Sequence, residues 1–111
     1  MGMGREVIYT TEIEEFIHNL TYTLFQKRYF SFFEDAQQYV DNLLSYVEKY
    51  TGILPGKNAP SYFNSHGENL KYITYQPNKT TTWYVFYQQQ EHIFLICYIS
   101  NNHFEGQYFN L

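Results

Sequence analysis

The chain has 111 residues, of which 44% are apolar, and it carries a formal net charge of −4 with a pI near 5.4. This length suits a single domain over residues 1–111, and no run approaches the roughly 20 apolar residues that a membrane span needs. The acidic balance argues against strong autonomous binding of nucleic acid, because proteins that neutralise phosphates usually present a basic face.

The single cysteine and the first residues bear on the compartment. Cys97 has no internal partner for a disulfide, which fits a reducing environment. The first residues lack the basic and then apolar order of a secretion signal. We therefore expect a cytoplasmic protein that does not associate with membranes.

The first predicted elements are a strand and a helix. Residues 6–10 form a short β-prone run, and Thr11 followed by Glu14 has the spacing of a capping box. Apolar residues then recur at intervals of three and four, which predicts a helix that fades near Lys27 and Arg28. These apolar residues are Ile13, Phe16, Ile17, Leu20 and Leu24.

A second amphipathic helix follows after a short connection. Ser31 and Glu34 repeat the capping-box spacing, and Gly52 supplies a left-handed stop with Pro55 beyond it. The apolar face consists of Phe33, Ala36, Val40, Leu43, Leu44 and Val47. The short connection predicts that the two helices form an antiparallel hairpin.

The second half of the chain has the pattern of β-structure. Residues 53–67 contain two prolines and two glycines and are expected to form a long loop, with a short strand at Tyr62-Phe63 as an alternative. Three β-prone runs, 70–76, 81–88 and 92–100, are separated by short polar turns, which is typical of an antiparallel meander. The aromatic tail 104–111 is expected to pack on the domain.

These elements predict an α+β fold in which an N-terminal strand and an antiparallel helical hairpin pack on a twisted antiparallel sheet. Two helices on one face of such a sheet form a stable layered arrangement. The opposite face is expected to stay partly open and, with the sheet edge, to meet another molecule.

The order β-α-α-β-β-β resembles the RelE/ParE superfamily of bacterial toxins. The resemblance includes the final strand pair, Thr82-Trp83-Tyr84-Val85-Phe86-Tyr87 and Ile93-Phe94-Leu95-Ile96-Cys97-Tyr98-Ile99. It also includes the polar segment Asn101-Asn102-His103, which lies where family members often carry His or Tyr. The likeness extends from Val7 to Phe109 and rests on element order and pattern.

This resemblance implies a component of a type II toxin–antitoxin module with one of two activities. RelE-like members are endoribonucleases that cleave mRNA in the ribosomal A site, and ParE-like members inhibit DNA gyrase. The implied partners are a cognate antitoxin protein and either the ribosome with its mRNA or gyrase. A homodimer through the exposed sheet edge is left open. No cofactor is expected, because the four histidines and one cysteine lack the spacing of metal ligands.

The implied catalytic residues are His103, Lys71, Lys79 and Tyr108. Cleavage through the ribose 2′-OH needs a proton acceptor, cations for the phosphorane and an acid, and His103 suits the acid or base role. Each residue also has a structural interpretation: His103 as a loop residue that caps a strand, the lysines as solvated hairpin residues, and Tyr108 as a packed ring.

The sequence departs from the family at its arginine. Thr81-Thr82-Trp83 stand where the family's arginine is expected, and no arginine follows Arg28. A lysine cannot reproduce the bidentate guanidinium clamp on phosphate. Two alternatives therefore stand beside the toxin: a non-catalytic protein-binding module with the same fold, and an unrelated α+β protein whose aromatic sheet face binds a partner or a hydrophobic ligand.

Overall fold

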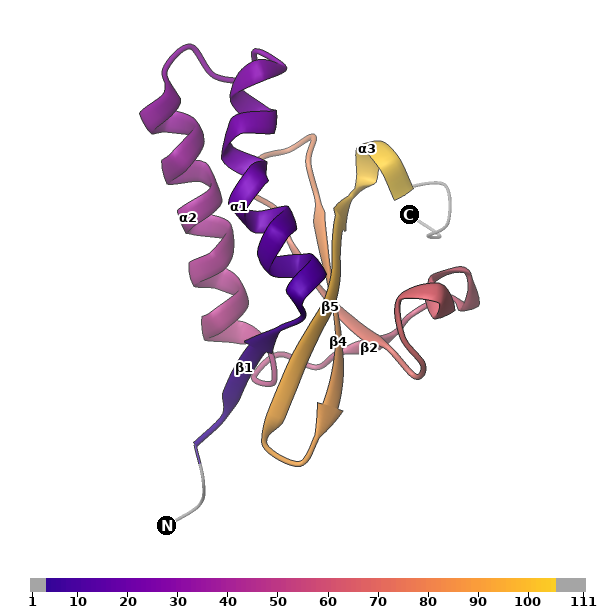
Figure 1. Cartoon of the computed structure of the whole chain (residues 1–111). Coiled ribbons are helices and arrows are strands. Elements are labelled where there is room, and N and C mark those ends of the chain that lie inside the picture. Colours follow the sequence, from indigo (N-terminus) through magenta and orange to yellow (C-terminus); the bar gives the residue numbers. More distant parts are fainter. Residues whose placement is uncertain (1–3, 106–111) are drawn as a thin grey trace.

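The computed structural model describes residues 4–105, and side chains are described for residues 4–103. Two helices pack on a five-stranded mixed sheet, so the fold is α+β (Figure 1). The elements in chain order are β1 (Glu6–Tyr9), α1 (Thr11–Gln26), α2 (Phe33–Tyr50), β2 (Lys57–Asn58), a 3-10 helix η1 (Ser61–His66), β3 (Lys71–Tyr75), β4 (Trp83–Gln90), β5 (Ile93–Asn101) and α3 (Asn102–Glu105).

The sheet has the strand order β1-β5-β4-β3-β2, so the first and last strands of the chain are neighbours. β1 runs parallel to β5, with Val7 opposite Phe94. The other three pairings are antiparallel. The expectation of an antiparallel sheet therefore holds for β2 to β5 and is wrong for β1, because the crossing helices α1 and α2 carry the chain back before it enters the sheet again.

Helix α1 begins one residue earlier than the capping pattern indicated. Thr10, and not Thr11, is the N-cap, and its hydroxyl accepts a hydrogen bond of 3.2 Å from the Ile13 amide. Thr10 has the extended backbone that an N-cap requires, whereas Thr11 is already helical. At the other end, the Tyr29 amide donates to the Leu24 carbonyl and Arg28 adopts φ 62°, which is a Schellman ending with arginine in the position that favours glycine.

Helix α2 differs from expectation at its start and agrees with it at its end. The N-cap is Phe32, which makes no side-chain capping hydrogen bond, so the capping box at Ser31 is wrong because Ser31 lies one residue too far from the first turn. Gly52 has φ 87° and confirms the predicted stop. The Arg5 guanidinium closes this end by donating to the carbonyls of Glu48 at 2.6 Å, Thr51 at 2.8 Å and Lys49 at 3.1 Å.

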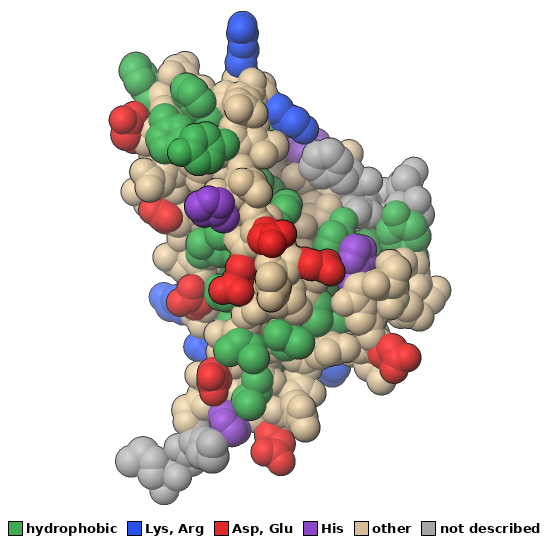
Figure 2. All heavy atoms as spheres, in the orientation of Figure 1, with side chains coloured by type: hydrophobic (Ala, Val, Ile, Leu, Met, Phe, Trp, Pro, Cys, Tyr) green, Lys and Arg blue, Asp and Glu red, His purple; other side chains and the backbone are tan. Residues whose placement is uncertain are grey.

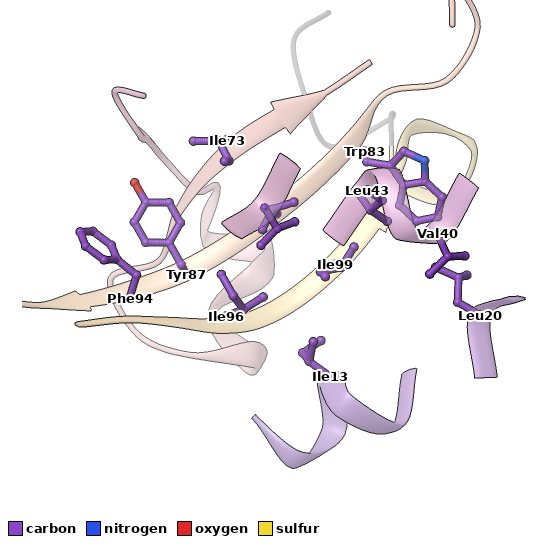
Figure 3. Packing of buried hydrophobic residues seen from close by; sticks show 12 residues of the cluster. Ile13, Leu20, Val40, Leu43, Ile73, Trp83, Tyr87, Phe94, Ile96 and Ile99 are labelled. Atoms are coloured by element: carbon purple, nitrogen blue, oxygen red, sulfur yellow. The ribbon is translucent and has the colours of Figure 1, made fainter. Parts of the chain in front are cut away.

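The main core lies between the helices and the sheet (Figure 3). The buried residues of this core are Ile13, Leu20, Val40, Leu43, Val47, Ile73, Trp83, Val85, Tyr87, Phe94, Ile96 and Ile99. The predicted apolar faces of both helices point into it. Burying such side chains stabilises the domain by about 1.5–3 kcal/mol each before the entropy of ordering is subtracted.

The opposite face of the sheet is covered only in part, because Tyr72, Leu95 and Tyr98 on this face stay partly exposed. The η1 helix lies over this face, and Phe63 is fully buried in a stack on Phe86 with ring centroids 4.5 Å apart. A second buried cluster forms there from Phe63, Leu70, Tyr84, Phe86 and Cys97. Tyr62 and Phe63, which were expected to lie in a loop or a short strand, thus belong to a 3-10 helix. This helix covers part of the sheet face.

The strand positions agree with the sequence pattern to within about two residues. The β4–β5 hairpin turns at Glu91 and His92, because Gln90 pairs with Ile93, so β4 is longer at this end than expected. Cys97 is the extra residue of a β-bulge, since Phe86 pairs with Tyr98 and Tyr87 with Ile96. Cys97 lies in the second cluster on the same face as Leu95, and the bulge brings Tyr98 onto this face as well. Burial raises the pKa of the Cys97 thiol.

Candidate functional site

His103 lies in the first turn of α3, directly after the last strand. Its Nε2 is 3.2 Å from the Thr81 hydroxyl oxygen, and its backbone amide donates to the Asn101 side-chain oxygen at 3.0 Å. The imidazole is exposed. A histidine in this position is accessible to a substrate. The side chain that contacts it, Thr81, is uncharged and supplies no cation for a phosphate.

Two asparagines order the loop between β3 and β4, and one of them, Asn102, ties this loop to the start of α3. Asn102 accepts from the Thr82 amide at 2.9 Å and donates through its side chain to the Thr80 carbonyl at 3.1 Å. Asn78 accepts from the amides of Thr80 and Thr81 at 3.0 and 2.9 Å. The polar segment that follows β5 therefore has a structural role, because it fixes the loop that carries Thr81.

The two lysines of the predicted catalytic set lie at different ends of the sheet. Lys79 is two residues before Thr81, which keeps the two Cα atoms within about 7 Å of each other. Lys71 pairs with Tyr87, four residues along β4 from Trp83, which is opposite Asn101. Four residues of strand span about 13 Å. Lys79 and His103 share one end, and Lys71 does not join them.

Tyr108 lies outside the described residues. Of the two arginines, Arg5 is engaged by three carbonyls at the end of α2, and Arg28 lies in the connection between the helices. The concave basic patch that RNA would need around Lys71, Lys79 and His103 is thus not formed by the part of the chain that the structure describes.

An aromatic surface occupies the connection between the helices. Four rings are exposed there: Tyr22 by 56%, Phe25 by 36%, and Tyr29 and Phe32 by 66% each. We call these four residues the aromatic tip. Figure 2 shows green side chains gathered over this end of the molecule, with Lys or Arg side chains in blue beside them.

Packing orders two of the four rings of the aromatic tip. Tyr22 and Phe25 both contact the half-buried Phe33, with ring centroids 5.1 and 5.6 Å apart. Phe33 belongs to α2 and the other two rings to α1, so this packing joins the tip to both helices. Exposed aromatic groups fixed in this way are typical of sites that bind other proteins.

The sequence contained a signal for this surface. The connection Tyr29-Phe30-Ser31-Phe32 is aromatic, whereas connections between helices are usually polar. Phe30 is half-buried and packs on Tyr39 at 5.2 Å. The other two rings of the connection, Tyr29 and Phe32, stay exposed. Which of these rings is buried depends on the tertiary structure, so the sequence pattern does not reveal it.

Two depressions in the surface of the described part of the chain are shallow and small. One of about 230 Å³ lies beside β3 and is lined by residues that include Tyr46, Pro55 and Tyr72. Another of about 330 Å³ lies between β1, α1 and α2, with Glu14 and Glu48 in its wall. Neither is the deep apolar cavity under the sheet that a hydrophobic ligand would require.

The described residues contain neither a group of side chains that could bind a metal ion nor a helix that could span a membrane. Between residues 4 and 105, no group of three or more His, Cys, Asp or Glu side chains is placed to hold a metal ion. None of the described helices is long and apolar enough to cross a membrane.

Comparison with known proteins adds no relative. No family model, no curated protein and no solved structure matches the chain. Functional argument therefore rests on the residues and their arrangement.

Proposed function

We propose that this protein is a non-catalytic protein-binding module with a RelE/ParE-like fold, and that it docks its partner on the aromatic tip. The observation that carries the proposal is the exposure of Tyr29 and Phe32 by 66% each beside two further exposed rings. The fold assignment is supported by the order of the elements, in which β1 and the helices α1 and α2 are followed by the antiparallel strands β2 to β5. The partner is an antitoxin-like protein that presents an apolar segment.

Energetics favour this surface as a docking site. An aromatic side chain buries about 150–250 Å², so covering the exposed parts of these rings would contribute about 1–3 kcal/mol for each. Two of the four rings, Tyr22 and Phe25, are held by Phe33, which reduces the entropy that these two side chains lose on binding. Arg28, fixed by the Schellman ending, is a residue type enriched in binding hot spots.

The test is site-specific cross-linking followed by an affinity measurement. A photo-crosslinking amino acid is placed at Phe32 and, as a control, at Ile53, which is 62% exposed just beyond the other end of α2. An 18-residue helix is about 27 Å long, so the control samples a distant surface. We expect a protein adduct from position 32 that position 53 does not give.

The affinity of the purified partner for variants of the aromatic tip is then measured. Replacing Tyr29 and Phe32 together by serine is expected to weaken its binding at least about 30-fold, whereas Ile53→Ser leaves the affinity unchanged. Identical adducts from both positions, or an unchanged affinity of the double variant, would refute docking on the tip.

A second candidate is ribosome-dependent mRNA cleavage of the RelE type. The contact of 3.2 Å between Thr81 and His103 favours it, because it brings the imidazole to the loop that carries Lys79. In this mechanism His103 transfers the proton and Lys79 neutralises the phosphate. Lys71 lies too far along the sheet to take part in the same step.

Induced expression in bacteria with mapping of mRNA ends tests this candidate. Growth arrest with codon-phased cleavage is expected for the wild type and for Lys71→Ala, and is expected to be lost in His103→Ala and Lys79→Ala. Arrest without cleavage would favour a gyrase-type target. Unaffected growth with folded protein would exclude the toxin activity for this chain.

A further inference from the structure

The sheet has two edges, and the one formed by β2 and β3 is blocked. β2 pairs only with Lys71 and Tyr72. Continuing this register by two positions places Pro55 opposite Thr74, and proline has no N–H to donate. The Thr74 carbonyl accepts instead from the Tyr46 hydroxyl at 2.6 Å. Proline and occupied carbonyls are devices that protect an edge from pairing with another chain.

The other edge, β1, carries no such device along its centre. The amides of Glu6 and Thr10 donate to the carbonyls of His92 and Ile96 in and beside β5, at 2.9 and 3.2 Å. Backbone groups alternate along a strand, so the amides and carbonyls of Val7 and Tyr9 point away from β5, on the side where the sheet ends. The strand thus offers two donors and two acceptors in one row.

This row is complementary to itself. In an antiparallel pair of two β1 strands, outward-facing residues must oppose outward-facing residues. The two-fold axis must therefore lie at a residue, and this residue is then opposite the same residue of the second copy. An axis at Ile8 places Val7 opposite Tyr9 of the second copy and uses the whole extended stretch from Glu6 to Thr10. Four backbone hydrogen bonds then form.

Side chains and charges agree with this register. Ile8 is 40% exposed and lies beside Leu95 in the sheet, and Figure 2 shows green side chains over this part of β1 and β5. With the axis at Ile8, the two Ile8 side chains touch across the axis. Glu6 opposes Thr10 of the second copy, so no like charges face each other.

We propose that two copies of this chain associate through antiparallel pairing of their β1 strands about a two-fold axis at Ile8, which joins the two sheets into one. The interface is isologous, as is usual for homodimers. It is small, so the dimer belongs to the weak and reversible class. The proposal involves neither the aromatic tip nor His103 and stands or falls independently of both.

A cysteine at the axis tests the register directly. Residues that face each other without hydrogen bonds across an antiparallel pair have Cα atoms about 4.5 Å apart, within the range that a disulfide spans. Under mild oxidation Ile8→Cys is expected to give at least about ten times more linked dimer than Ile53→Cys, an exposed control position. The native Cys97 is buried and is shared by both variants.

Charge substitutions provide an independent test in solution. Sedimentation equilibrium is expected to show a concentration-dependent dimer for the wild type and monomers for Ile8→Lys and for Ile8→Glu, because like charges meet at the axis. An equimolar mixture of these two variants is expected to restore the dimer. Ile53→Lys should dimerise like the wild type.

Two results would overturn the proposal. One is a wild type that stays monomeric throughout the concentration series. The other is cross-linking of Ile8→Cys at the level of Ile53→Cys, with the cooperative urea unfolding of both variants showing that they are folded.

Discussion

Trp83 of β4 donates its indole N–H to the hydroxyl oxygen of Tyr39 on α2 at 2.8 Å, and this hydrogen bond ties the sheet to the helical hairpin. Trp83 is buried, and its ring centroid lies 6.4 Å from that of Tyr39. Burial raises the pKa of the Tyr39 hydroxyl, and the bond from Trp83 lowers it in part. A buried indole N–H that loses its acceptor has no water to replace it.

We predict that Tyr39→Phe lowers the free energy of unfolding by about 1–3 kcal/mol, because it leaves this N–H unsatisfied. Trp83→Phe also destabilises, through lost volume. The double variant should cost less than the sum of the two, by about 1 kcal/mol or more. Urea unfolding gives these values, and Tyr29→Phe, which alters an exposed hydroxyl, serves as the neutral control. Strict additivity would contradict the predicted coupling.

A second prediction concerns Arg5, which closes the C-terminus of α2. Arg5→Ala is expected to destabilise the protein by about 1–3 kcal/mol, because three carbonyls lose a charged donor at the negative end of the helix dipole. Arg5→Lys should restore part of this, since a lysine supplies the charge without the planar fork. Chemical denaturation measures the loss. If Lys57→Ala, at an exposed position, costs as much, the capping role is refuted.

The ending of α1 offers a stabilising substitution. Arg28 has φ 62°, a conformation that costs a residue with a Cβ about 1 kcal/mol relative to glycine. Arg28→Gly should therefore raise the free energy of unfolding by about 0.5–1 kcal/mol, although glycine also loosens the unfolded chain. Gln26→Gly, at the last residue of the same helix, should instead lower it, because glycine has the weaker helix propensity. A lower thermal midpoint for Arg28→Gly would show that its side chain contributes more than its backbone costs.

A fourth prediction is a loss of stability in alkali. The folded state raises the pKa of several tyrosines: Tyr9, Tyr39, Tyr46, Tyr72, Tyr84 and Tyr87. Burial is the main cause for all of them, and at Tyr9 the charge of Glu48 adds to it, 3.2 Å from the hydroxyl. Because the folded state keeps these groups protonated, their contribution is complete below the unfolded pKa of about 10 and is lost as the pH rises through the folded values.

Unfolding free energies measured between pH 8 and about pH 11 should stay level at first and then fall, by up to about 1.4 kcal/mol per pH unit for each such group. The part of the tyrosinate absorbance that comes from these six side chains should rise only with unfolding. Tyr9→Phe should make the fall less steep. A stability that is constant up to about pH 11 would contradict the prediction.

The local elements of the fold were predictable because their signals are local. Apolar spacing located both helices, and the change to β-branched and aromatic runs located β3 to β5 within about two residues. The caps at Thr11 and Ser31 were misplaced because several hydroxyl and acidic residues stand near each helix start, and backbone geometry decides which one caps. The end of α2 at Gly52 was predicted correctly, because a left-handed residue after a helix is usually glycine.

Long-range arrangements were not predictable from these patterns. Nothing near Arg5 indicates that its guanidinium reaches the end of α2, 43 residues away at Glu48. Residue spacing likewise does not indicate at which end of the sheet a lysine lies relative to His103. In the structure Lys71 lies away from the end that holds His103 and Lys79. The aromatic tip had a signal in Tyr29 and Phe32, but exposure depends on how much core the rest of the fold can offer.

The pairing of β1 with β5 also sets the order in which the molecule can assemble. Glu6 is opposite Ile93, so 93 − 6 = 87 residues separate the partners, and a contact of this span carries a large loop-closure cost. During synthesis, α1 and α2 emerge early and can form their hairpin, while β1 waits for the final strand. Until then Val7, Ile8 and Tyr9 have no sheet to join. The sheet is therefore completed last, by the one of its strands that leaves the ribosome before the others.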